Sequence, residues 1–126
     1  MDLNLFVLAC IGILDIKRPV EIRLLNKNKR KPYGEFAAWA ETRTRNGKVI
    51  RHVIGVNLNR NVESGYSIYD VIAHELVHSV LLENEKHDHN YHHNKRFQNI
   101  CKILEQGLAE INMPVGALYN PLSDTD

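Results

Sequence analysis

The pentapeptide His74-Glu75-Leu76-Val77-His78 limits the possible folds of this chain more than any other feature, because it places two histidines four residues apart in an apolar run. On an α-helix, residues four apart lie on one face, one turn apart. Ser67, with Asp70 three residues later, is typical of a helix start and predicts a helix over 68–83. Two imidazoles on one such face can bind a single Zn²⁺ with the glutamate beside it, which is the H-E-x-x-H pattern of zinc hydrolases.

The remaining patterns predict one compact α+β domain over residues 1–115 and a C-terminal tail over 116–126. The length of 126 residues suits a single domain. Asn46-Gly47 between two alternating runs is a strong hairpin signal. Residues 59–65 read as a loop. The expected elements are a helix over 2–14, a strand over 20–24, hairpin strands over 34–43 and 49–58, the 68–83 helix, and a final helix over 91–111.

A catalytic zinc site usually has three protein ligands, so a third must come from elsewhere in the chain. His93 extends the apolar stripe of the final helix backward, and this phase directs it toward the helix that carries His74 and His78. Other histidines of the same segment, and two carboxylates farther along the final helix, stay open as alternatives. These are His87, His89, His92, Glu105 and Glu110.

Cysteine usage and hydropathy predict a protein of a reducing compartment. Cys10 and Cys101 are far apart and form no C-x-x-C pair, so we expect buried free thiols. The apolar stretch over 3–14 is too short to span a bilayer and has no basic segment before it. We therefore expect an N-terminal core helix, no membrane partner, and a location in the cytoplasm, or in the host cytoplasm if the protein is viral.

The positive charge is concentrated in residues 16–51, which hold eleven Lys or Arg and three Asp or Glu, although the net charge is +1. A basic segment of this kind can attract DNA or another anionic partner. The alternative is a solvated basic surface. The run 27–31 is the densest part of this charge and reads equally well as a phosphate contact or an exposed turn.

The histidine pair together with His93-Asn94-Lys95-Arg96-Phe97 resembles the SprT-like, or Spartan-type, zinc metalloproteases. That family has H-E-x-x-H, a loop, and then a histidine that opens a helix with an aromatic residue four positions on. The resemblance extends over most of residues 1–110 and covers a protease core. It implies a zincin-like fold, with Zn²⁺ bound by His74, His78 and His93 and Glu75 as catalytic base. Asn94 departs from the glycine common at that position.

The resemblance implies hydrolysis of peptide bonds in flexible or unfolded protein segments, among them DNA-associated proteins. Zinc would polarise the scissile carbonyl, and Glu75 would take a proton from water and pass it to the leaving amine. Tyr66 and Tyr91 are candidates for stabilising the oxyanion. Sites of this kind commonly bind the substrate as an added strand, for which residues 49–58 are the expected edge.

Two other functions fit the same residues. One is a non-catalytic, metal-stabilised nucleic-acid-binding domain, in which His89 or His92 closes the zinc site as a fourth ligand. The other is a zinc hydrolase that acts on a non-peptide amide. Glu75 favours catalysis, because a structural metal site does not need a base at that position.

Overall fold

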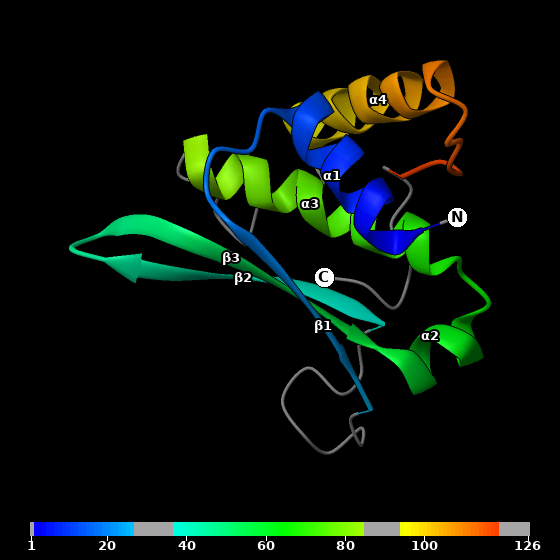
Figure 1. Ribbon diagram of the computed structural model, residues 1–126, viewed down its shortest axis with the longest axis horizontal. Helices are drawn as coiled ribbons and strands as arrows, with labels where there is room; N and C mark the ends of the chain where they lie inside the picture. Colours follow the sequence, from blue (N-terminus) through cyan, green and yellow to red (C-terminus); the bar gives the residue numbers. More distant parts are fainter. Residues whose placement is uncertain (1, 27–36, 85–93, 119–126) are drawn as a thin grey trace.

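The computed structural model describes residues 2–26, 37–84 and 94–118. These residues form helices packed on one three-stranded sheet, which confirms the predicted α+β class (Figure 1). The elements, in chain order, are α1 (Leu3–Leu14), β1 (Val20–Leu25), β2 (Ala38–Arg45), β3 (Lys48–Asn57), α2 (Leu58–Ser64), α3 (Ile68–Asn84) and α4 (Lys95–Glu110).

The sheet has the order β1-β3-β2, with β1 parallel and β2 antiparallel to β3. The hairpin predicted at Asn46-Gly47 is present, and both residues have the positive φ angles, 53° and 76°, that a tight two-residue turn needs. The expectation that 49–58 forms a free edge was wrong. Strand β3 lies in the centre of the sheet, because β1 pairs along its second side.

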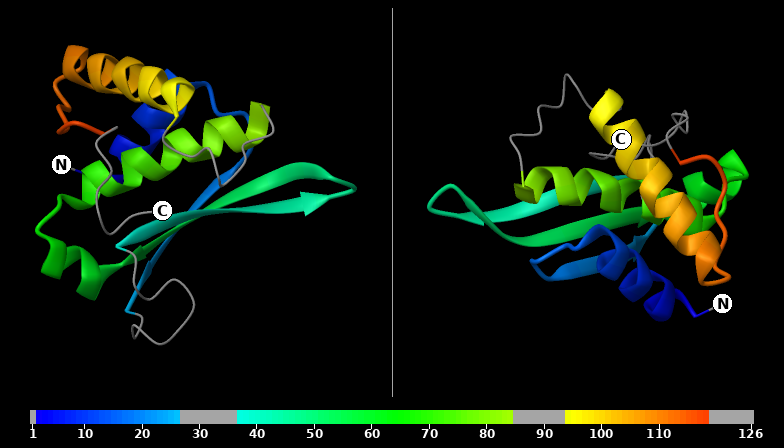
Figure 2. Two further views of the ribbon diagram at one scale, coloured as in Figure 1. Left: turned by 180° about the vertical axis from the view of Figure 1, so that it is seen from behind. Right: turned by 90° about the horizontal axis from the view of Figure 1, so that it is seen from above.

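The three long helices lie on one side of the sheet, as two opposite views show (Figures 1 and 2). Helix α3 packs directly against β2 and β3, while α1 and α4 pack against α3 and against each other. The approach of α4 to α1 is close, because a Cβ at Gly107 would lie 2.9 Å from Ile13. Helix α3 is therefore enclosed on several sides, and its residues from Val71 to Leu81 are all buried.

On the opposite face of the sheet, an aromatic ring packs against the backbone. Trp39 of β2 pairs in register with Gly55 of β3 and is 2% exposed. A Cβ at Gly55 would lie 2.2 Å from the indole, so the ring packs directly on the glycine backbone. The indole N–H donates to Glu41 at 3.1 Å. The single tryptophan is thus a packing residue.

One element was missed in the sequence. Residues 59–65, expected as a loop, fall largely within the short helix α2. The helix ends at Gly65, whose φ of 76° permits the left-handed C-cap, and its N–H donates to the Val62 carbonyl. The polar composition of this segment hid the helix, because seven residues are too few to show a helical apolar period.

Candidate functional site

Helix α3 holds the two predicted histidine ligands side by side. His74 and His78 lie one turn apart, with ring centroids separated by 5.3 Å, and both side chains are buried. The helix begins as predicted, since the Ser67 hydroxyl accepts a hydrogen bond from the N–H of Tyr69. The apolar faces of α3 pack against the sheet and the neighbouring helices, which fixes the rotation of the helix and so the direction of both rings.

Phe97 of α4 contacts both histidines. Its ring centroid lies 5.0 Å from that of His74 and 4.4 Å from that of His78, and the side chain is fully buried. Asn94 fixes the start of α4, because its side-chain oxygen accepts from the Phe97 N–H at 3.0 Å. The first turn of α4 therefore lies beside the histidine pair.

The predicted third ligand, His93, lies outside the described residues, as do His87, His89 and His92. The prediction that the final helix already includes Asn94 was wrong. Asn94 has an extended backbone (ψ −178°) and is the N-cap of α4, which begins at Lys95. Within the described ranges, no three His, Cys, Asp or Glu side chains are grouped closely enough to hold a metal ion.

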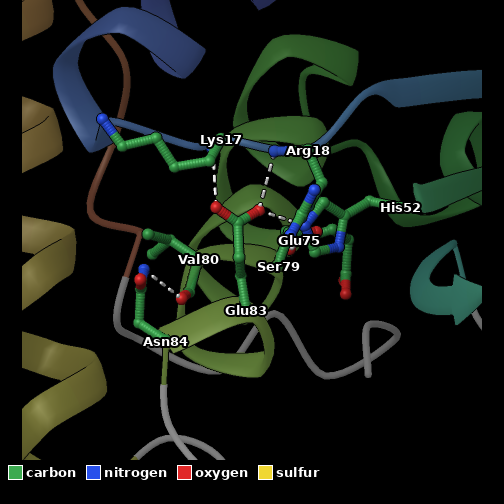
Figure 3. Close-up of polar contacts among 8 residues, drawn as sticks. All are labelled: Lys17, Arg18, His52, Glu75, Ser79, Val80, Glu83 and Asn84. Carbon is green, nitrogen blue, oxygen red and sulfur yellow. Dashed lines mark hydrogen bonds and ion pairs between the residues drawn. The ribbon is translucent and has the colours of Figure 1, made fainter. Parts of the chain in front are cut away.

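Glu75, the predicted base, is fully buried on α3 directly after His74. Glu75, Ser79 and Glu83 follow one another at intervals of four residues and so lie on one face of the helix. Figure 3 shows this face together with His52 of β3. The catalytic candidate therefore projects from a different face of α3 than its neighbour His74, as the 100° step between adjacent helical residues requires.

His74 has a backbone partner that the sequence did not reveal. Its Nδ1 lies 2.7 Å from the carbonyl oxygen of Leu118, and a carbonyl can only accept, so the hydrogen is on Nδ1. A neutral imidazole in this form carries its lone pair on Nε2, the arrangement typical of a metal-binding histidine held by a carbonyl. The donor chemistry of His74 therefore fits a zinc ion.

The structure also describes the surroundings of most other candidate residues. Burial raises the pKa of both Cys10 and Cys101 to about 12, so each stays a thiol at neutral pH, and both are free and buried as predicted. Glu105 accepts from the Leu118 N–H at 2.6 Å. Glu110 is exposed at the end of α4. Tyr66 is partly buried against the core, and Tyr91 lies outside the described residues.

A second buried polar cluster was also missed. Glu83, at the end of α3, accepts hydrogen bonds from the His52 ring at 2.7 Å and from the backbone N–H groups of Lys17 and Arg18 (Figure 3). It thereby joins the helix to β3 and to the segment before β1. Residues that meet only through the tertiary fold, such as His52 and Glu83, give no local sequence signal.

Comparison with family models, with curated proteins and with solved structures found no match for this chain. In the described part of the chain, no helix is both long enough and apolar enough to cross a membrane.

Proposed function

We propose that this protein is a SprT-like, zinc-dependent endopeptidase that hydrolyses peptide bonds in flexible or unfolded protein segments. The proposal rests on the buried pair His74 and His78, in which the Nδ1–H of His74 donates a hydrogen bond to the Leu118 carbonyl. The free and buried thiols are in keeping with a cytoplasmic location.

His74 and His78 would hold the metal ion, with His93 as the proposed third ligand. Support for His93 comes from Phe97, which lies in the first turn of α4 and contacts both histidine rings. The part of the chain that follows His93 in sequence therefore lies next to the pair. A bound zinc ion would supply a Lewis acid that polarises a carbonyl and acidifies a water molecule.

Glu75 is the proposed base. Its carboxylate would accept a proton from the attacking water and return the proton to the leaving amine. Its burial favours this role, because an electrostatic interaction is stronger in a site from which bulk water is excluded. The packing of α3 against β2 and β3 would hold the carboxylate in place during the reaction.

The substrate would bind as an extended strand along the outer edge of β2. Among the described elements β2 pairs with β3 alone, and α3 packs against it, so this edge runs beside the helix of the proposed site. Backbone hydrogen bonds to such an edge read little sequence, which suits unfolded or flexible segments.

The ligand set is tested by measuring bound zinc after metal loading. We expect about one zinc per chain in the wild type and a large loss in His74→Ala, His78→Ala and His93→Ala. His89→Ala and His92→Ala are matched controls from the same segment and should retain the metal. Loss of zinc from a control but not from His93→Ala would reassign the third ligand, and an unchanged zinc content in His74→Ala would contradict the site.

Nucleic-acid binding is a second candidate function, and the β2–β3 hairpin favours it. Arg43 pairs directly with Arg51, and Arg45 pairs with Lys48. Like charges opposite each other destabilise a sheet unless an anion lies between them. Glu21 lies near these positive charges and offsets part of them. Its hydrogen bond to Arg23 and the nearby charges of Arg51 and Arg43 lower the pKa of Glu21, although partial desolvation acts in the opposite direction.

The DNA contact is tested with a double variant, Arg45→Gln with Lys48→Gln, in salt-dependent DNA binding. We expect weaker binding and a shallower dependence on salt than in the wild type. DNA binding with zinc bound and no cleavage of any protein would favour the non-catalytic binding domain. Cleavage of small amides without cleavage of proteins would favour the non-peptide hydrolase.

A further inference from the structure

The chain after α4 returns to α3 as a short segment, residues 113–118, which we name the C-terminal strap. It begins where Met113 donates its N–H to the Leu108 carbonyl at 2.9 Å. It ends at Leu118, which is fully buried and belongs to the hydrophobic core. Within the expected tail at 116–126, Gly116 is therefore hydrogen-bonded to α3 and Leu118 is packed in the core.

Both backbone polar groups of Leu118 are hydrogen-bonded. Its N–H donates to Glu105 Oε1 of α4 at 2.6 Å, and its carbonyl accepts from His74 Nδ1 of α3 at 2.7 Å. Leu118 thus links a carboxylate on α4 to an imidazole on α3 through two separate hydrogen bonds. The Leu118 N–H and carbonyl belong to consecutive peptide groups, so Glu105 acts on the carbonyl by fixing the position of Leu118.

A second contact holds the strap against α3. The Gly116 N–H donates to Asp70 Oδ2 at 3.3 Å, and a Cβ at Gly116 would lie 2.8 Å from the same oxygen. Burial raises the pKa of Asp70, and the Gly116 N–H offsets part of that rise. The strap is therefore attached to the start of α3, to α4, and to His74 itself.

We infer that Glu105 is a positioning residue for the metal site, acting through the Leu118 carbonyl to hold His74 with hydrogen on Nδ1 and its lone pair on Nε2. This inference rests on the proposed function. A histidine free to rotate or to exchange tautomers would present its Nε2 lone pair for only part of the time, and its metal affinity would fall accordingly. Loss of such a supporting partner typically weakens metal binding by about 10–100-fold.

The direct test is the tautomer of His74 in the metal-free wild type, read from ¹⁵N imidazole shifts at a pH where the histidines are neutral and assigned with His74→Gln. We expect the Nδ1–H form. A predominant Nε2–H form in the folded wild type would overturn the inference without any variant.

Zinc affinity of two variants gives the second test. Glu105→Gln keeps an acceptor for the Leu118 N–H and should bind zinc nearly as the wild type does. Glu105→Ala removes the acceptor and should bind zinc about 10–100-fold more weakly, with His74 in mixed tautomers. Glu110→Ala, an exposed carboxylate on the same helix, is the matched control and should match the wild type. Thermal unfolding of each variant identifies loss of affinity that comes from unfolding.

The outcomes separate the two proposals. Normal zinc binding by the wild type, with the same affinity and tautomer in Glu105→Ala, would overturn the positioning role alone. Absence of zinc binding by the wild type would overturn the proposed function, and the positioning role would fall with it. Weakened binding in Glu105→Ala that Glu105→Gln restores supports the role of Glu105, because a loss of packing alone would leave the tautomer unchanged.

Discussion

His52 and Glu83 form a buried pair in which the imidazole Nε2 lies 2.7 Å from the carboxylate, with the two side chains 0% and 6% exposed. Because Glu83 also accepts from the Lys17 and Arg18 backbone N–H groups, one carboxylate joins α3, β3 and the segment before β1. This contact fixes the end of α3 against the sheet, eight residues beyond the proposed base.

Removal of the Glu83 carboxylate should destabilise the fold. Glu83→Ala leaves the buried His52 ring without this partner, and we expect the free energy of unfolding in urea to fall by about 1–3 kcal/mol at neutral pH. Glu63→Ala is the control, because Glu63 forms an exposed ion pair with Arg60 and should cost less than about 1 kcal/mol. Equal effects of the two substitutions would contradict the structural role of Glu83.

The same pair predicts how stability depends on pH. Burial alone would raise the pKa of Glu83, but the His52 side chain and the two backbone N–H groups hold it below its ordinary 4.5. A carboxyl group whose pKa is lower in the folded state stabilises the fold above its unfolded pKa and loses this effect as the pH falls through the folded value. The difference in unfolding free energy between wild type and Glu83→Gln should therefore shrink below pH 4.5. A difference that grows in acid would show the opposite sign.

Gly55 should not tolerate a side chain. Because a Cβ there would lie 2.2 Å from the Trp39 indole, Gly55→Ala must displace the ring, and we expect a loss of about 1–3 kcal/mol in urea unfolding together with a change in tryptophan fluorescence. Gly12→Ala is the matched control. Gly12 lies within α1 with nothing near its Cβ position, so alanine should stabilise the fold by about 0.5–1 kcal/mol. A neutral Gly55→Ala would contradict the packing of Trp39.

Asn94 should matter as a cap and not as a ligand. Asn94→Ala removes the acceptor for the Phe97 N–H and should destabilise the fold by about 1 kcal/mol. Asn94→Gly, the residue common in the family that the chain resembles, should cost only a few tenths of that amount. Both variants should keep their zinc. Thermal unfolding and metal content measured together check this, and complete zinc loss in a folded Asn94→Gly variant would contradict it.

Local sequence patterns were sufficient for the elements that carry strong signals. The turn at Asn46-Gly47, the start of α3 at Ser67 and the apolar face of α4 each depend on residues close together in the chain. Strand order was not readable in the same way. Alternation shows that 49–58 is a strand, but its central position depends on β1, which lies more than twenty residues earlier.

The candidate site shows the same division. The spacing of His74 and His78 was enough to place both rings on one face of a helix. Leu118 was not found as a partner of the site and Glu105 was named only as an alternative ligand, because a backbone carbonyl has no sequence signature and the strap meets α3 only in the folded chain. The start of α4 was misjudged for a local reason, since Asn94 has an extended backbone and caps the helix with its side chain.

The central claim, metal-dependent peptide hydrolysis with Glu75 as base, is tested most directly by cleavage of a loosely folded protein with zinc content measured in parallel. The samples are the wild type and Glu75→Gln, assayed with and without DNA. We predict cleavage by the wild type, zinc content close to equal in both proteins, and a rate at least about 100-fold lower in Glu75→Gln. Equal cleavage by both proteins, or zinc binding by both with no cleavage under either condition, would contradict the account.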